Sequence, residues 1–300
     1  MSVDEGVLSE NQEPQKGLPP VAPPSGRFIA QLFLVPGLIV GVAVLILLGF
    51  TWLVGGDSDP QTLLDRMENS NADVRWRAAN EFMQRLKKDP QLASDPRLAL
   101  RLTKLLRKAL AELDRTEKAL AGSAEVAPDR KTLQEKRKDV EFLSPCLGHM
   151  IIPTGAPILC EMARKTAGHD AKTIASLRRK AVWSLANLGE NLKRYDRLSS
   201  EESNKVLEAL EQTLAEQQGE QLQWARLTLQ YLQGERKNLG VFQALADCAK
   251  ADDPFLRELA AMAFSFWDGD AEDNALAEKT LLALARDDGH GVRIEIGEND

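Results

Sequence analysis

The feature that most constrains this chain is an uncharged apolar segment near its N-terminus, which runs from Phe28 to Val54. A helix of this length reaches about 40 Å at about 1.5 Å per residue, which exceeds the roughly 30 Å hydrocarbon core of a bilayer. Arg27 stands at its near end, Trp52 lies close to its far end, and Gln31 is its one strongly polar side chain. The sequence therefore predicts a single tilted transmembrane helix over residues 28–54.

A cleaved secretory signal is the competing interpretation of this segment. The apolar run is longer than the usual run of about 7 to 15 residues in such signals, and no small-residue cleavage site follows it. We therefore expect an uncleaved anchor and a single-pass membrane protein, with a bacterial inner membrane as the expected location. Two basic residues precede the segment, Lys16 and Arg27, and one follows it closely, Arg66. This small excess weakly favours a cytoplasmic N-terminus, but it does not decide on which side of the membrane the rest of the chain lies.

Two glycines in the apolar segment, Gly37 and Gly41, have the four-residue spacing that lets transmembrane helices approach closely. A homodimer through this face is one interpretation, and the ordinary abundance of glycine in such helices is the other. Residues 1–27 are rich in proline and acidic side chains and poor in apolar ones, so we expect a disordered tail there.

The chain after Gly55 has the pattern of an all-α protein. Alanine and leucine are abundant, and apolar residues recur at spacings of three and four, as in the stripe Val74, Ala78, Phe82 and Leu86. Helix starts are predicted by three Asp-Pro pairs, where aspartate caps and proline takes the first helical position, and by a capping box. These signals are Asp59-Pro60, Asp95-Pro96, Asp253-Pro254 and Ser199 with Glu202.

A string of nine residues recurs within this helical region. It reads Val74-Arg75-x-x-Ala78-Ala79-x-x-Phe82, then Leu177-Arg178-x-x-Ala181-Val182-x-x-Leu185, then Leu256-Arg257-x-x-Ala260-Ala261-x-x-Phe264. A looser copy from position 221 keeps Ala225 and Leu229, a degenerate copy lies near Val140, and Val292-Arg293 begins a further one. The period of about 35 to 44 residues is typical of stacked helix pairs.

This pattern resembles the HEAT-repeat family, and the chain as a whole resembles a membrane-anchored bacterial-type HEAT-repeat domain protein. The resemblance implies an armadillo/HEAT-type α-solenoid over residues 55–300, with about five helix pairs in a right-handed superhelix. An irregular helical bundle with the same periodicity is the alternative. Between Leu113 and Val140 the repeat spacing is interrupted, and a charged helical hairpin near 113–140 is predicted, either as a structural element or as a partner-binding prong.

Charge is unevenly distributed along the chain, whose net charge is -7. Residues 57–200 are net basic and residues 201–300 strongly acidic, so the basic side chains are the candidates for contact with an acidic partner. These candidates are Arg101, Lys104, Arg107, Lys108, Arg130, Lys131, Lys136, Arg137 and Lys138. Nucleic acid is not an expected partner, because acids interleave with these cations and the acidic C-terminal part would repel phosphate.

No set of residues with the spacing of a catalytic or metal site is found. The three cysteines, Cys146, Cys160 and Cys248, indicate no disulfide framework. Four side chains could in principle bind zinc, but they lack the close paired spacings of a structural zinc module: Cys146, His149, Cys160 and His169. Residues 268–279 lack the glycine and the bidentate glutamate of a calcium loop. We therefore predict no catalytic residue, no cofactor and no metal, and expect that the protein is not an enzyme.

The HEAT resemblance implies a protein–protein interaction scaffold or adaptor that recruits or organises a partner at the membrane surface. One alternative is a structural subunit of a larger membrane or envelope complex. Another comes from the bilin lyases, which are also built from short HEAT-like repeats, although no local feature of this chain selects that activity.

Overall fold

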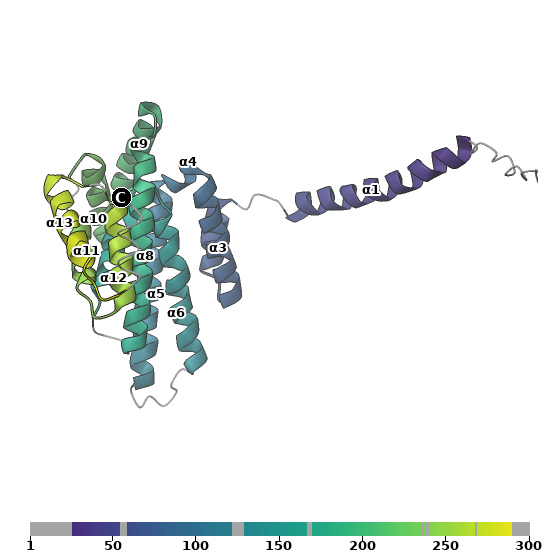
Figure 1. Cartoon of the computed structure of the whole chain (residues 1–300). Helices are drawn as coiled ribbons and strands as arrows, with labels where there is room; N and C mark the ends of the chain where they lie inside the picture. The colour runs from purple at the N-terminus through teal and green to yellow at the C-terminus, as the bar shows by residue number, and fades with distance from the viewer. Residues whose placement is uncertain are drawn as a thin grey trace, which may run out of the picture. The chain divides into compact units, whose positions relative to one another are not determined.

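The computed structural model describes residues 26–54, 59–121, 129–166, 170–235, 237, 240–267 and 269–289, with residues 28–32 and 48–54 described by their backbone alone. Within these ranges the chain is helical and has no strand. It divides into two units, Met1–Asp57 and Ser58–Asp300 (Figure 1). The predicted tail over residues 1–25, the tip of the predicted hairpin at 122–128 and the repeat copy at Val292 lie outside the described residues.

The described residues of the first unit form one helix, α1 (Gly26–Val54), which includes Pro36. Its described apolar side chains, between residues 33 and 47, are exposed. Among the described residues, no helix has the length and apolar character needed to span a membrane. A Cβ atom added at Gly37 or Gly41 would meet no other atom within 4 Å, and dimerisation through these glycines stays a prediction.

The described residues of the second unit form helices of unequal length. They are α2 (Pro60–Met67), α3 (Ala72–Lys88), α4 (Pro90–Ala93), α5 (Pro96–Ala121), α6 (Arg130–Gly148), the 3-10 turn η1 (Pro153–Gly155), α7 (Ala156–Arg164), α8 (Ala171–Tyr195), α9 (Ser200–Glu216), α10 (Gly219–Leu232), α11 (Val241–Ala249), α12 (Pro254–Phe266) and α13 (Ala271–Leu284). The longest of these are α5 and α8.

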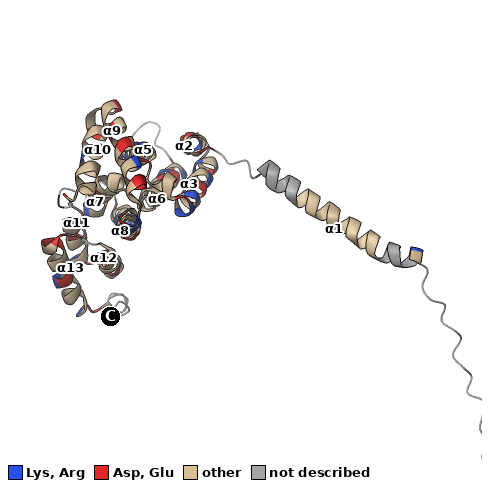
Figure 2. Cartoon of the chain, turned by 90° about the horizontal axis from the view of Figure 1, so that it is seen from above, with Lys and Arg blue, Asp and Glu red and all other residues tan. Residues whose placement is uncertain are grey.

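The helices of the second unit form two layers. Consecutive helices pack in pairs, α2 on α3, α5 on α6, α7 on α8 and α11 on α12. The second members α3, α6, α8 and α12 pack on one another in that order, and α7, α11 and α13 follow one another in the other layer (Figure 2). One contiguous core of buried leucines, alanines and isoleucines joins the layers. This stacking of helix pairs makes the unit an armadillo/HEAT-like helical solenoid, as the sequence predicted.

One helix pair departs from the predicted order. Helices α9 and α10 pack on each other and on α5 and η1, while α8 packs directly on α12. The prediction that the repeat copy from position 221 forms part of the stack is therefore wrong, because this copy lies in α10. Its partners are set by side chains outside the repeat pattern: the Thr228 hydroxyl donates to the Thr154 hydroxyl of η1 at 3.0 Å, and Trp224 lies under the Arg107 guanidinium of α5.

The arginine of the repeated string has the same structural role in its three copies. Each one donates to backbone carbonyls in the last turn of the preceding helix or in the turn that follows it. Arg75 bonds the carbonyls of Asn69 and Ser70, Arg178 that of Ala163, and Arg257 those of Ala251 and Asp252. The arginine thus fixes the turn inside a helix pair.

The predicted helix starts are confirmed, since Pro60, Pro96 and Pro254 begin α2, α5 and α12, and the Ser199 capping box is formed. Asp95 and Asp253 accept hydrogen bonds from backbone N–H groups of the first turn, whereas the Asp59 side chain makes no such capping bond. Helices α5 and α6, which flank the tip of the predicted hairpin near 113–140, pack on each other as one of the stacked pairs. The role of this hairpin, as a structural element or as a partner-binding prong, stays a prediction.

Candidate functional site: a charged cleft beside α5

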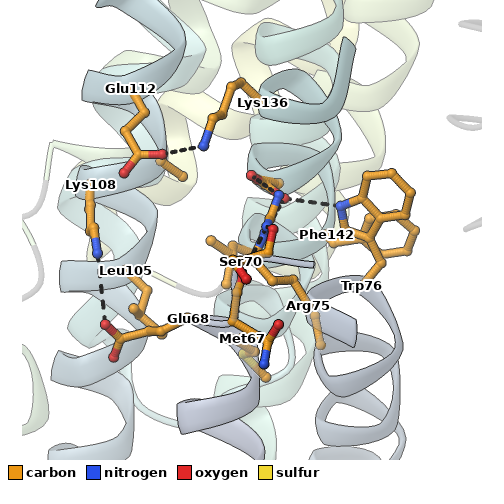
Figure 3. Close-up of a pocket in the computed structure, with 15 residues that line it drawn as sticks. Met67, Glu68, Ser70, Arg75, Trp76, Leu105, Lys108, Glu112, Lys136 and Phe142 are labelled. Carbon is orange, nitrogen blue, oxygen red and sulfur yellow. Dashed lines mark hydrogen bonds and ion pairs between the residues drawn. The ribbon is translucent and has the colours of Figure 1, made fainter. Parts of the chain in front are cut away.

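Three adjoining cavities surround the contact between the first two helix pairs. The central cavity, of about 330 Å³, lies between α2–α3 and α5–α6 (Figure 3). The α5 groove, of about 800 Å³, follows α5 between α2 and the α9–α10 pair. The α3–α6 mouth, of about 520 Å³, lies between the first turns of α3 and α6. Because the central cavity shares Glu68 and Lys108 with the α5 groove and Trp76 with the α3–α6 mouth, we describe all three as one charged cleft.

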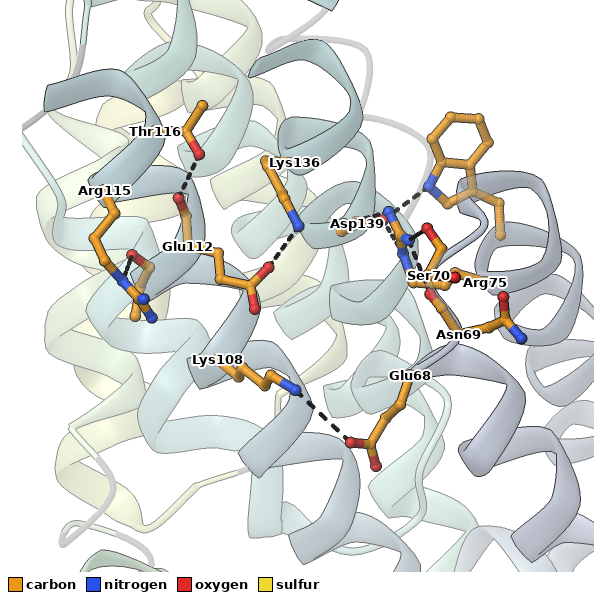
Figure 4. A network of polar contacts seen from close by, with 12 residues as sticks. Glu68, Asn69, Ser70, Arg75, Lys108, Glu112, Arg115, Thr116, Lys136 and Asp139 are labelled. Carbon is orange, nitrogen blue, oxygen red and sulfur yellow. Dashed lines mark hydrogen bonds and ion pairs between the residues drawn. The ribbon is translucent and has the colours of Figure 1, made fainter. Parts of the chain in front are cut away.

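Ion pairs line the central cavity. The Lys136 ammonium lies 2.6 Å from a Glu112 carboxylate oxygen and joins α6 to α5, while Lys108 lies 3.8 Å from Glu68 at the end of α2 (Figure 4). Partial burial acts to raise the pKa of Glu112, but the hydrogen bond and the charge of Lys136 outweigh it, so this pKa lies below its ordinary value. The carboxylate of Glu112 is therefore held ionised beside its partner.

A buried carboxylate joins the two helix pairs at the edge of the cavity. Asp139 of α6 accepts two hydrogen bonds from the Arg75 guanidinium, both at 2.9 Å, and one from the Trp76 indole at 3.0 Å. The Trp76 ring stacks on Phe142 with 6.0 Å between ring centroids, and the Lys138 ammonium lies 4.6 Å from the Trp76 centroid. An aromatic wall with a cation on it thus borders the α3–α6 mouth.

The α5 groove has an apolar floor and cationic side chains along its length. Leu100 and Leu105 of the floor are buried. Arg101 is fixed to the neighbouring helix by ion pairs with Asp65 and Glu68 and by a hydrogen bond to Gln61 at 2.8 Å. Its position is therefore set by α2, whose polar side chains form one wall.

Arg107 is fixed to the opposite wall. Its guanidinium forms ion pairs with Glu161 at 2.9 Å and Glu220 at 2.6 Å and lies 5.1 Å from the Trp224 ring centroid. The Arg107 Nε atom is buried and has no hydrogen-bond partner among the described residues. Lys104 is exposed between these two arginines and forms no ion pair with a described residue. It is the cation of the groove whose charge the surrounding walls leave uncompensated.

Most of the predicted partner-binding residues meet in this cleft. Lys136 lines the central cavity, and Lys131 and Lys138 line the α3–α6 mouth. Arg101, Lys104, Arg107 and Lys108 line the α5 groove. Two residues lie elsewhere: Arg130 is exposed at the first turn of α6, and Arg137 faces α8, where it pairs with Asp170 at 3.5 Å and donates to Thr173.

Sequence reasoning missed the aromatic wall and the acidic partners on the walls of the groove. Trp76 and Phe142 each stand two residues after the apolar residue that opens a repeat copy, Val74 and Val140, so their shared register was a usable signal. The acidic partners Glu161 and Glu220 come from α7 and α10, and no local pattern connects them with α5.

The cleft offers ion pairs, aromatic faces and amide side chains, which are suited to binding. Among the described residues, no group of three or more His, Cys, Asp or Glu side chains is arranged to hold a metal ion. Cys146 and Cys160 are buried and line none of the three cavities, and burial raises the pKa of each thiol to about 12. Burial, with the nearby charges of Lys87 and Arg194, lowers the pKa of His149 to about 4.

Comparison with known families finds no matching family model, and no curated protein matches the chain. Among solved structures, an engineered protein (Northeast Structural Genomics Consortium target OR366) is 14% identical, with 80% of this chain and 96% of that chain covered and a TM-score of 0.31. A designed armadillo repeat protein in complex with the peptide (KR)4 is also 14% identical, with 80% and 97% covered and a TM-score of 0.28. TM-scores below 0.5 do not establish a shared arrangement, so the fold rests on the helix packing described above.

Proposed function

We propose that this protein is a membrane-tethered interaction scaffold that docks a segment of a protein partner in its charged cleft. The observation that carries the proposal is the α5 groove. Its walls come from α2, α9 and α10, its floor is apolar, and Lys104 presents a charge without a described partner. A recessed, partly apolar surface with few charged contacts resembles grooves that bind peptide segments.

The membrane tether is supported by the sequence from 28 to 54, which has no charged residue. The α1 helix covers this whole range, and its described side chains between residues 33 and 47 are apolar and exposed. Exposed apolar surface of this extent is costly in water, since burial is worth roughly 25 cal/mol per Å². Insertion of α1 into a bilayer would remove this cost.

Site-specific photocrosslinking on intact membranes tests the docking site. A photoreactive amino acid is placed at Gln61 or Ala111, both in the α5 groove, and as controls at Gln84 of α3 or Glu278 of α13, which are exposed outside the cleft. We expect one protein adduct from the groove positions that the control positions do not give. Equal adducts from all four positions, or none from Gln61 and Ala111, would contradict the docking site.

A further inference from the structure

The cationic side chains of the α5 groove form one straight stripe. Arg97, Arg101, Lys104 and Lys108 are separated by four, three and four residues, which places them on the same face of a helix. From Arg97 to Ala111 this face extends about 21 Å at about 1.5 Å per residue. The groove is therefore long enough to lie against about four turns of another helix.

Positive side chains outnumber negative ones in the lining of the groove. Five cations, the stripe and Arg107, face two carboxylates, Glu68 and Glu216. Arg101 and Arg107 also bind carboxylates outside the lining, which hold them in place, while Arg97 pairs with Glu216 at the longer distance of 3.6 Å. The C-terminal half of the stripe is left with the least compensated positive charge, because Lys104 forms no ion pair with a described residue and Lys108 lies 3.8 Å from Glu68.

We infer that the α5 groove takes an acidic, amphipathic helical segment of the partner protein, which lies along α5 with carboxylates facing Lys104 and Lys108. This inference rests on the proposed docking function and names the chemistry of its occupant. Leu100 and Leu105 supply the apolar floor, Gln61, Gln217 and Gln221 supply hydrogen-bonding walls, and the stripe supplies the complementary charge. An incoming helix would pack between α2 and α10 as a further member of the helical array.

Two other anionic occupants fit this geometry less well. A lipid bilayer presents a flat surface, whereas Lys104 lies between walls that carry Glu68 and Glu216. A nucleic acid presents phosphates along its whole length, and the same carboxylates, with Glu161 and Glu220 beside them, would repel it. A protein segment avoids this repulsion because its carboxylates can be placed at the stripe alone.

The test combines photocrosslinking at Ala111 in the full chain on membranes with charge reversal. The double variant Lys104→Glu/Lys108→Glu is compared with Lys172→Glu/Lys279→Glu, which makes the same charge change at exposed sites outside the cleft. We expect the groove variant to reduce the adduct yield by about tenfold or more, because like charges face each other across the interface. The control variant should give the original yield. Circular dichroism establishes that both variants are folded, and Lys104→Gln/Lys108→Gln should give an intermediate yield.

Mass spectrometry of the adduct identifies the occupant. We expect a protein segment with net negative charge and carboxylates at helical spacing, and changing those carboxylates to lysine should restore crosslinking to Lys104→Glu/Lys108→Glu. A neutral or basic segment, a phospholipid adduct, a second copy of this chain, or a yield insensitive to charge reversal would overturn the inference. A neutral or basic partner segment would leave the proposed docking function standing. If the chain without charge reversal gave no adduct at Ala111, both the docking function and the acidic occupant would be refuted.

Discussion

Asp139 is the residue on which the contact between the first two helix pairs most depends. Its carboxylate is nearly buried and accepts three hydrogen bonds from Arg75 and Trp76. Removal of one partner from such a pair leaves an uncompensated buried charge. We expect Asp139→Ala to lower the free energy of unfolding by about 3 kcal/mol, measured by urea denaturation of the full chain in detergent with circular dichroism.

The matched control for Asp139 is an exposed ion pair on α3. Arg85 and Glu81 are one helical turn apart and lie 3.2 Å from each other in an exposed position. Glu81→Ala should cost only about 0.3 to 0.5 kcal/mol. Similar losses for the two variants would show that Asp139 does not hold the helix pairs together.

Asp253 at the start of α12 makes stability depend on acidity. The hydrogen bonds from Arg179, at 2.7 and 2.9 Å, are the main cause that lowers the pKa of this carboxyl group below its ordinary value. A lowered pKa stabilises the fold above the unfolded value of about 3.9, and this contribution is lost as the pH falls through the folded pKa. We expect Asp253→Asn, which can still cap α12, to cost about 0.5 to 1 kcal/mol at pH 6.

The pH dependence separates this pair from a simple capping effect. Unfolding free energies measured from pH 6 down to pH 2 should show the difference between Asp253→Asn and the original chain shrinking towards zero below pH 4. The exposed neighbour Asp252 serves as the control, and Asp252→Asn should change the unfolding free energy little at pH 6. A constant difference for Asp253→Asn across this range would contradict the role of Arg179.

At the scale of helices, α8 and α12 pack closely because Gly189 has no side chain. A Cβ atom at this position would lie 2.7 Å from the Trp267 Nε1 atom, which donates to the Leu185 carbonyl at 3.2 Å. Gly189→Ala would favour the helix by up to about 1 kcal/mol but forces a buried indole to move. We expect a net loss of about 1 to 2 kcal/mol in unfolding free energy, measured by urea denaturation.

The control for Gly189→Ala is its exposed neighbour Glu190, where substitution by alanine should change stability by less than about 0.5 kcal/mol. If Gly189→Ala stabilised the protein, the close approach of Trp267 to α8 would be refuted. The double variant Gly189→Ala/Trp267→Phe should recover part of the loss, since the smaller ring relieves the contact.

The sequence predicted where helices begin better than it predicted which helices pack together. Helix starts such as Pro96 and Pro254 follow from local chemistry, because a cap and a first-position proline act within one turn. The place of α10 depends on contacts of Trp224 and Thr228 with α5 and η1, which the repeat period does not encode. The basic residues of the site were visible in the sequence, but their grouping was not, since it depends on carboxylates from α2, α7 and α10.

At the scale of the whole molecule, the two units differ in what stabilises them. All described residues of the hydrophobic core lie in Ser58–Asp300, and the described apolar side chains of α1 are exposed. Deletion of residues 28–54 should therefore leave the helical solenoid folded, with a helical circular dichroism spectrum and a cooperative thermal transition within a few degrees of that of the full chain.

The same deletion tests the proposed tether. The full chain should stay in the membrane pellet after alkaline carbonate extraction, and the deleted chain should move to the supernatant, because the apolar surface that favours the bilayer is gone. Replacement of residues 28–54 by a polar linker of equal length is the control for chain length and should behave like the deletion. Release of the full chain by carbonate would refute the tether while leaving the α5 groove available for docking in solution, and an unfolded deletion variant would show that α1 contributes to the core.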